Sequence, residues 1–129
     1  THPSFSFWAA GPARARREIA RCSDAIRQAV GTAPTRFRAP VGMANPFVHL
    51  AAHAAGLQLA GWSASGNDGV PHDPARVITK ITAALHPGAI ILMHESHLPG
   101  MREGQRACTL ESVLASVHRH GFSFVLDPA

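Results

Sequence analysis

A histidine and a glutamate follow an unbroken apolar stretch of the sequence. Residues 89–93 read Ala-Ile-Ile-Leu-Met after the turn signal Pro87-Gly88, and His94 and Glu95 come next. A continuous apolar run of this length predicts a strand that is buried on both faces of a parallel sheet. Chemistry in α/β folds is found at the carboxyl ends of such strands, so His94 and Glu95 are candidate site residues by position. The alternative is a histidine that merely follows the strand into solvent.

Two further polar residues lie at the ends of earlier predicted strands. Arg38 closes the predicted strand 35–38, and Asp68 lies in the loop after the predicted strand 57–62. The loops that follow parallel strands lie on the same side of a sheet. We therefore expect Arg38, Asp68 and His94 to converge on one site.

These loops depend on an alternation of helices and strands. Helices are predicted to start at Gly11-Pro12, Asn45-Pro46 and Asp73-Pro74, because Pro suits the first helical turn and Asn or Asp caps it. A fourth helix is predicted to start at the cap Thr109. The strands that follow the four helices are predicted at 35–38, 57–62, 89–93 and 122–126. Four helix–strand repeats predict an α/β fold with a mostly parallel sheet and no domain boundary.

The composition is that of a globular domain with a surplus of positive charge. The 129 residues carry a net charge of +4, and the first predicted helix contains several arginines, namely Arg14, Arg16, Arg17, Arg21 and Arg27. No aromatic residues interleave with them, as a single-strand binding platform would need, so a solvated helix face is favoured and no nucleic-acid partner is expected. No run approaches the ~18 apolar residues of a membrane span.

The spacing of the cysteines and of the remaining histidines does not predict a metal site. Cys22 and Cys108 lack metal-like spacing, and Cys22 shares the apolar stripe of its helix, so a buried core thiol is predicted. His49 and His53 are four residues apart, a spacing that can bind metal on a helix. Without a third ligand in view, a surface pair is favoured. The two cysteines do not indicate a cellular compartment.

Four stretches together resemble the motifs of one family. Phe37-Arg38-Ala39-Pro40-Val41-Gly42 resembles the arginine-proline loop of polysaccharide deacetylases (carbohydrate esterase family 4, the NodB homology domain). Residues 61–68 resemble the family's next motif, which ends in an acidic residue, and Leu92-Met93-His94-Glu95 resembles its leucine-any-histidine-acid motif. Thr1-His2-Pro3 is similar to the end of its metal motif. The motifs come in the family's order, which implies an incomplete, deformed (β/α) barrel with parallel strands, of the glycoside hydrolase/deacetylase type.

The resemblance implies a metal-dependent hydrolase that acts on an acetylated carbohydrate. Family members remove an N- or O-acetyl group from a sugar with a divalent metal, expected to be zinc, that one Asp and two His hold. Such a site leaves coordination positions open for water and the acetyl carbonyl. An acidic residue acts as the base, and a histidine protonates the leaving amine.

The resemblance assigns catalytic and metal-binding roles to four residues. His2 would be the second metal histidine, and His94 would be the general acid. Asp68 would favour the protonated form of His94, as a nearby carboxylate does. Arg38 would orient the base aspartate.

The resemblance also assigns two residues to the substrate. The backbone N–H of Val41 would stabilise the oxyanion, and Leu92 would line the pocket for the acetyl methyl group. Three positions depart from the family pattern. Val41 replaces a usual aromatic residue, Gly69 replaces a common pocket Trp, and Glu95 replaces an Asp.

The family's first motif, with the base Asp and the metal Asp, has no counterpart before His2, and neither has its first metal histidine. Residues 1–129 are therefore expected to form a single, N-terminally truncated deacetylase domain that is inactive as this fragment. The alternative belongs to another class. It is a non-catalytic remnant of the same fold that binds a glycan or a partner through the same cleft.

Overall fold

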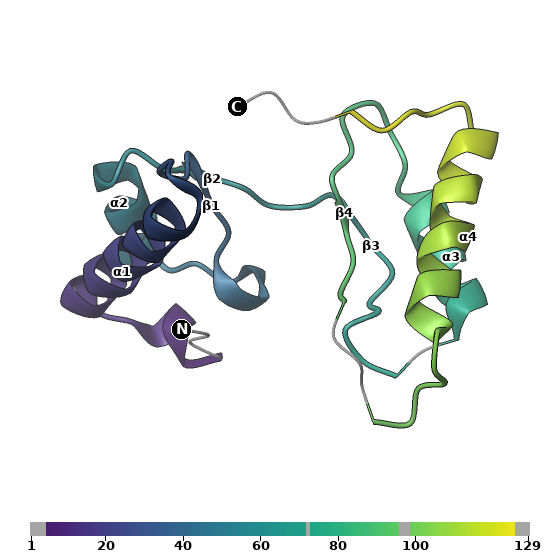
Figure 1. The fold of residues 1–129 in the computed structure, drawn as a ribbon, viewed down its shortest axis with the longest axis horizontal. Coiled ribbons are helices and arrows are strands. Elements are labelled where there is room, and N and C mark those ends of the chain that lie inside the picture. The colour runs from purple at the N-terminus through teal and green to yellow at the C-terminus, as the bar shows by residue number, and fades with distance from the viewer. Residues whose placement is uncertain (1–4, 72, 96–98, 126–129) are drawn as a thin grey trace. The chain divides into compact units, whose positions relative to one another are not determined.

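The first long helix, α1, spans Pro12–Val30, as the sequence predicts. It is seen in a computed structural model, which describes residues 5–71, 73–95 and 99–125 (Figure 1). The proline ring of Pro12 fixes its φ at a value that suits the first turn of a helix. Gly31 ends the helix with a left-handed φ of 80°, which glycine adopts without a Cβ clash. Local sequence thus sets both ends of α1.

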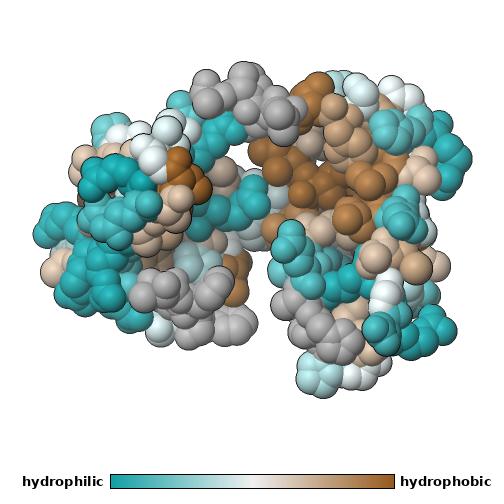
Figure 2. Space-filling model, in the orientation of Figure 1, coloured by the Kyte–Doolittle hydropathy of each residue, from teal (hydrophilic) through white to brown (hydrophobic). Residues whose placement is uncertain are grey.

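The prediction of a buried Cys22 on α1 is wrong, because this thiol is exposed. Burial on the helix is limited to Ala15 and Ile19 in its first half, and Ile26 on the same stripe is 38% exposed. The helix that packs against α1, α2 (Pro46–Ala54), is about half as long and cannot cover the whole stripe. The arginine-rich face of α1 is exposed and hydrophilic, as predicted (Figure 2).

The first of two compact units runs to Gly61. It contains the 3-10 helix η1 (Phe5–Ala9), α1, β1 (Arg36–Phe37), the 3-10 helix η2 (Pro40–Gly42), α2 and β2 (Gln58–Leu59). β1 and β2 pair in parallel. Asn45 caps α2 as predicted, since its side chain accepts a hydrogen bond from the Val48 N–H at 2.9 Å. The core of this unit consists of Phe7, Ala10, Ala15, Ile19, Val48, Ala51, Ala52 and Leu57.

The second unit begins at Trp62 and carries β3 (Ala64–Ser65), α3 (Pro74–Ala83), β4 (Ile91–Leu92) and α4 (Gln105–Arg119). β3 and β4 pair in parallel, with Ser65 opposite Leu92. α3 and α4 pack against each other (Figure 1). Asp73 caps α3 as predicted, since it accepts a hydrogen bond from the Ala75 N–H at 3.0 Å. The buried core consists of Val77, Ile81, Val113 and Val117.

Three strand predictions need correction. β4 is not buried on both faces, because α3 and α4 pack against the side that carries Ile91 and Met93, while Ile90 is 38% exposed. Hydrophobic surface lies over the β3–β4 pair (Figure 2). The predicted loop after Trp62 contains β3. Residues 122–125 form no strand, because none of the strands in the described ranges pairs with them.

The last helix begins four residues earlier than the predicted cap. Gly104 lies just before α4, with a left-handed φ of 73°. Thr109 is buried inside the helix, where its hydroxyl donates a hydrogen bond to the Gln105 carbonyl at 2.7 Å. Thr residues inside helices commonly bond back to the preceding turn in this way. The earlier start places Arg106 in the first turn of α4.

The predicted α/β class with parallel strands is confirmed, since both strand pairs are parallel and both units pair strands with helices. Each unit is described by itself, and the prediction of a single domain stays a prediction. Across the described ranges, none of the helices combines the length and the apolar character that crossing a membrane requires.

Gly66 lies where the chain between β3 and α3 passes closest to the helix. A Cβ atom on Gly66 would lie 2.9 Å from the Val77 Cα and closer still to its side chain. Because part of this contact is backbone, the loop would have to move away from α3, and overpacking of this kind costs ~1–3 kcal/mol. We expect Gly66→Ala to lower the free energy of unfolding by about this amount in urea denaturation.

Gly61→Ala is the matched control for this prediction, because a Cβ atom at Gly61 meets no other atom within 4 Å. Equal stability of the Gly66→Ala and Gly61→Ala variants would contradict the tight packing of the loop on α3.

Candidate active site

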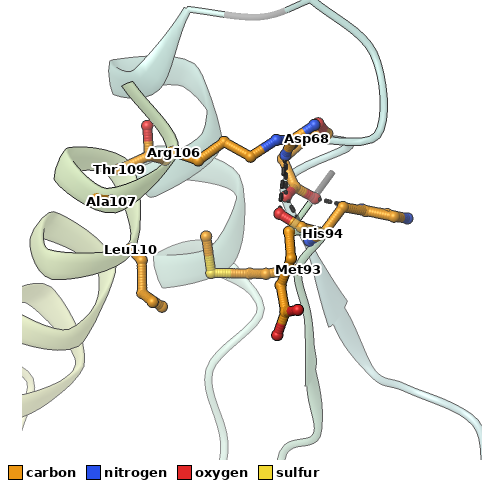
Figure 3. Close-up of a pocket in the computed structure, with 8 residues that line it drawn as sticks. Asp68, Met93, His94, Arg106, Ala107, Thr109 and Leu110 are labelled. Atoms are coloured by element: carbon orange, nitrogen blue, oxygen red, sulfur yellow. Dashed lines mark hydrogen bonds and ion pairs between the residues drawn. The ribbon is translucent and has the colours of Figure 1, made fainter. Parts of the chain in front are cut away.

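Asp68 and His94 lie side by side, as the sequence predicts (Figure 3). Asp68 lies in the loop after β3, and His94 follows β4. The His94 Nδ1 lies 2.9 Å from the Asp68 Oδ1, and the His94 backbone N–H donates to Asp68 Oδ2 at 2.7 Å. β3 and β4 are parallel neighbours, so the segments that follow them leave from the same edge. Strand pairing therefore explains how residues 26 positions apart meet.

The two side chains differ strongly in exposure. The Asp68 side chain is 1% exposed and the His94 side chain is 43% exposed. An ionised carboxylate only accepts hydrogen bonds, so beside an ionised Asp68 the donor is the His94 Nδ1. The ring extends away from α4 (Figure 3). The other ring nitrogen, Nε2, is then the position that can exchange a proton with a bound molecule.

Gly69 lies against the His94 ring. A Cβ atom on Gly69 would lie 3.1 Å from the His94 Cε1 and 3.2 Å from its Nε2. Contacts this short would require the ring to give way. The observed ring position therefore depends on the lack of a side chain at residue 69.

Arg106 completes the cluster, and sequence reasoning missed it. Its Nη1 donates to Asp68 Oδ2 at 3.2 Å, to the Asp68 carbonyl at 3.1 Å and to the His94 carbonyl at 2.9 Å. The side chain is 15% exposed. With Thr109 taken as the cap, Arg106 fell in a predicted loop. Reading Gly104 as the residue before the helix would have placed it in the first turn of α4.

A pocket of about 330 Å³ lies beside the pair, lined by Asp68, Met93, His94, Glu95, Arg106, Ala107, Thr109 and Leu110. Leu92, predicted to line an acetyl pocket, does not line this one. Successive residues of a strand face opposite sides, and Ile91 and Met93 pack toward the core of α3 and α4. The predicted role of Leu92, on the other face, stays a prediction.

Arg38 and Val41 belong to the first unit. Arg38 donates hydrogen bonds to the carbonyls of Ala60 and Gly61 at 3.4 and 3.1 Å. Val41 has a φ of 51°, which is uncommon for a β-branched residue and is a kind of strain that clusters at functional sites. Because each unit is described by itself, the convergence of Arg38 with the Asp68–His94 pair stays a prediction.

The described residues do not fit the metal that the resemblance implies. Within the ranges 5–71, 73–95 and 99–125, no group of three or more His, Cys, Asp or Glu side chains could hold a metal ion. His49 and His53 are exposed on α2, as expected for a surface pair. His2 lies outside the described residues, so its predicted role as a metal ligand stays a prediction.

Known sequences resemble the chain over most of its length. A family model described as polysaccharide deacetylase matches residues 1–60. The chitooligosaccharide deacetylase of Bradyrhizobium sp. (strain ANU 289) is 32% identical over 134 residues, which cover 95% of this chain and 59% of that protein. The peptidoglycan-N-acetylglucosamine deacetylase PgdA of Listeria monocytogenes is 30% identical over 108 residues, covering 84% of this chain and 21% of that protein. The chain thus spans less than two thirds of the length of these relatives.

Two solved structures share the fold. The family 4 carbohydrate esterase from Streptomyces lividans, in complex with acetate, has a TM-score of 0.72 and 26% identity, covering 94% of this chain and 58% of that one. The wild-type CE4 family pseudoenzyme from Bacillus anthracis has a TM-score of 0.77 and 20% identity, covering 95% and 40%. Both likenesses extend well beyond residue 60. The chain therefore belongs to the polysaccharide deacetylase family, carbohydrate esterase family 4, and has part of the deformed-barrel fold of its longer relatives.

Proposed function

We propose that this chain provides the proton-donating side of a carbohydrate deacetylase site. His94 is the general acid, and Asp68 orients its ring and favours its protonated form. The proposal rests on the 2.9 Å contact between the His94 Nδ1 and the buried Asp68 carboxylate, which leaves Nε2 as the exchangeable position. The reaction class follows from the relatives, which are carbohydrate deacetylases.

The proposed reaction is the hydrolysis of an acetamido group on a sugar. Water adds to the acetyl carbonyl and would lose a proton to the base aspartate, and the C–N bond then breaks. The proton on the His94 Nε2 passes to the leaving nitrogen, which departs as an amine, and the ring becomes neutral. Asp68 keeps the Nδ1 protonated throughout, so only one ring nitrogen changes its state. With an O-acetyl group, the same proton would pass to the leaving oxygen.

Three further residues are proposed to orient the reacting groups. The backbone N–H of Val41 would donate to the oxyanion. Leu92 would contact the acetyl methyl group, and Arg38 would orient the base aspartate.

A divalent metal, proposed to be zinc, belongs to this function but lacks a site among the described residues. A catalytic zinc needs about three protein ligands. His2 would be one of them. The other ligands and the base aspartate are proposed to come from outside the residues that the structure describes.

The test is acetate release from acetylated chitooligosaccharides and from acetylxylan, with zinc supplied. Two proteins are compared: the 129-residue chain, and the same chain preceded by a segment with the family's two aspartates and first metal histidine. We expect metal-dependent release from the longer protein only, because one histidine cannot hold zinc at useful affinity. Calorimetry measures zinc binding by both. Stoichiometric zinc and turnover in the 129-residue chain would contradict the proposal that ligands lie elsewhere, and His49 and His53 would be examined first.

A second candidate is a non-catalytic protein that binds a glycan or a partner through the same cleft. Saturable binding of acetylated chitooligosaccharides by the longer protein, without acetate release, would support binding over catalysis.

A further inference from the structure

We infer that Arg106 is a positioning residue of the acid pair, and that its charge neutralises Asp68 so that His94 can release its proton. The inference rests on the proposed function of His94 as the general acid. It concerns a residue whose hydrogen bonds go to Asp68 and to the backbone carbonyl of His94. Arg106 would act through Asp68 and through the backbone that carries His94.

The contacts of Arg106 join the two segments that form the pair. A single nitrogen, Nη1, donates to the Asp68 carboxylate, to the Asp68 carbonyl and to the His94 carbonyl, at 2.9 to 3.2 Å. In Figure 3 the arginine reaches across from α4 to Asp68, which lies between the guanidinium and the His94 ring. α4 thereby fixes the loop after β3 to the end of β4.

The charges explain why a second cation at Asp68 matters. Without Arg106, the buried Asp68 would have only the protonated His94 as a cationic partner. Loss of that proton would leave an unpaired buried carboxylate, which is costly, so the proton would be held tightly. Arg106 keeps its charge at any working pH and lies 3.2 Å from the carboxylate, so Asp68 stays paired in both states of His94. Glu95, the other charged residue that lines the pocket, is exposed.

The unused donors of Arg106 suggest a variant that separates its charge from its shape. Within the described residues, the buried Nε and Nη2 atoms have no hydrogen-bond partner. All contacts of the guanidinium are made by one nitrogen, and the ammonium of a lysine has three donors for the same three acceptors. Arg106→Lys therefore keeps the charge and offers donors for the same acceptors, whereas Arg106→Gln removes the charge.

The experiment follows the His94 ring by ¹H–¹⁵N NMR during a pH titration of the 129-residue chain, with the signal assigned by its absence in His94→Ala. We expect the titration midpoint to rise in Arg106→Gln, because a cation is removed and Asp68 is less neutralised. Arg106→Lys should stay close to the unmodified protein, and Asp68→Asn should move the midpoint the opposite way. Arg119→Gln, on the same helix but exposed, controls for the loss of one charge and should leave the midpoint unchanged.

A folded Arg106→Gln variant with an unchanged or lowered midpoint would overturn the inference, and so would a midpoint in Arg106→Lys as high as in Arg106→Gln.

A second measurement, made on the chain without any substitution, covers the case in which Arg106→Gln does not fold. The Asp68 carboxyl ¹³C signal of the unmodified chain should remain that of an ionised carboxylate after His94 loses its proton, and uptake of a proton by Asp68 at that point would contradict the inference. None of these measurements needs turnover, so a lack of deacetylase activity would count against the proposed function and leave the result on Arg106 standing.

Discussion

Replacement of His94 by alanine is expected to lower the kcat of acetate release by about 10²–10⁴-fold in the longer, zinc-loaded protein described above. The leaving nitrogen would then have to depart without a proton from the protein. Zinc content should not change, because His94 bonds to Asp68 and is not a proposed metal ligand. The measurements are kcat from acetate release at saturating substrate and zinc binding by calorimetry.

The matched control is His86→Ala, which removes a histidine of the same unit. The Nδ1 of this histidine lies 2.9 Å from the carbonyl oxygen of the neighbouring Pro87. Its kcat should equal that of the unmodified protein. An unchanged kcat in His94→Ala would remove His94 from the mechanism, and the binding alternative would then be favoured.

Asp68→Ala is expected to lower the free energy of unfolding of the second unit by ~3 kcal/mol or more. The substitution would leave the largely buried Arg106 without its carboxylate, and removal of one partner from a buried ion pair leaves an uncompensated charge. The His94 backbone N–H would also lose its acceptor. Urea unfolding, followed by NMR signals from α3 and α4, measures the loss.

Asp24→Ala is the control, because it breaks another aspartate–arginine pair. Asp24 lies 2.7 Å from Arg27, but the two side chains are 55% and 60% exposed. An exposed pair contributes only ~0–1 kcal/mol, so this variant should remain nearly as stable as the unmodified chain. A similar small loss for Asp68→Ala would show that burial does not strengthen the Asp68–Arg106 pair.

Local sequence by itself determined where most helices begin and that Asp68 and His94 come after strands. The pairs Gly11-Pro12, Asn45-Pro46 and Asp73-Pro74 each start a helix within a residue of the prediction, because Pro and a capping side chain act on the adjacent backbone. Asp68 and His94 were predictable because both follow parallel strands, whose carboxyl ends share one edge.

Tertiary structure alone decided the exposure of Cys22, the start of α4 and the contacts of Arg106. Periodicity gives the direction of a side chain but not the length of the partner that covers it, so the stripe on α1 continues beyond α2. Gly104, the residue before α4, is a weaker sequence signal for the start of a helix than a threonine. Thr109 instead lies inside the helix, where its hydroxyl bonds to the Gln105 carbonyl. Arg106 meets Asp68 across 38 positions of sequence, and no local pattern encodes a contact that exists only after α4 packs beside β4.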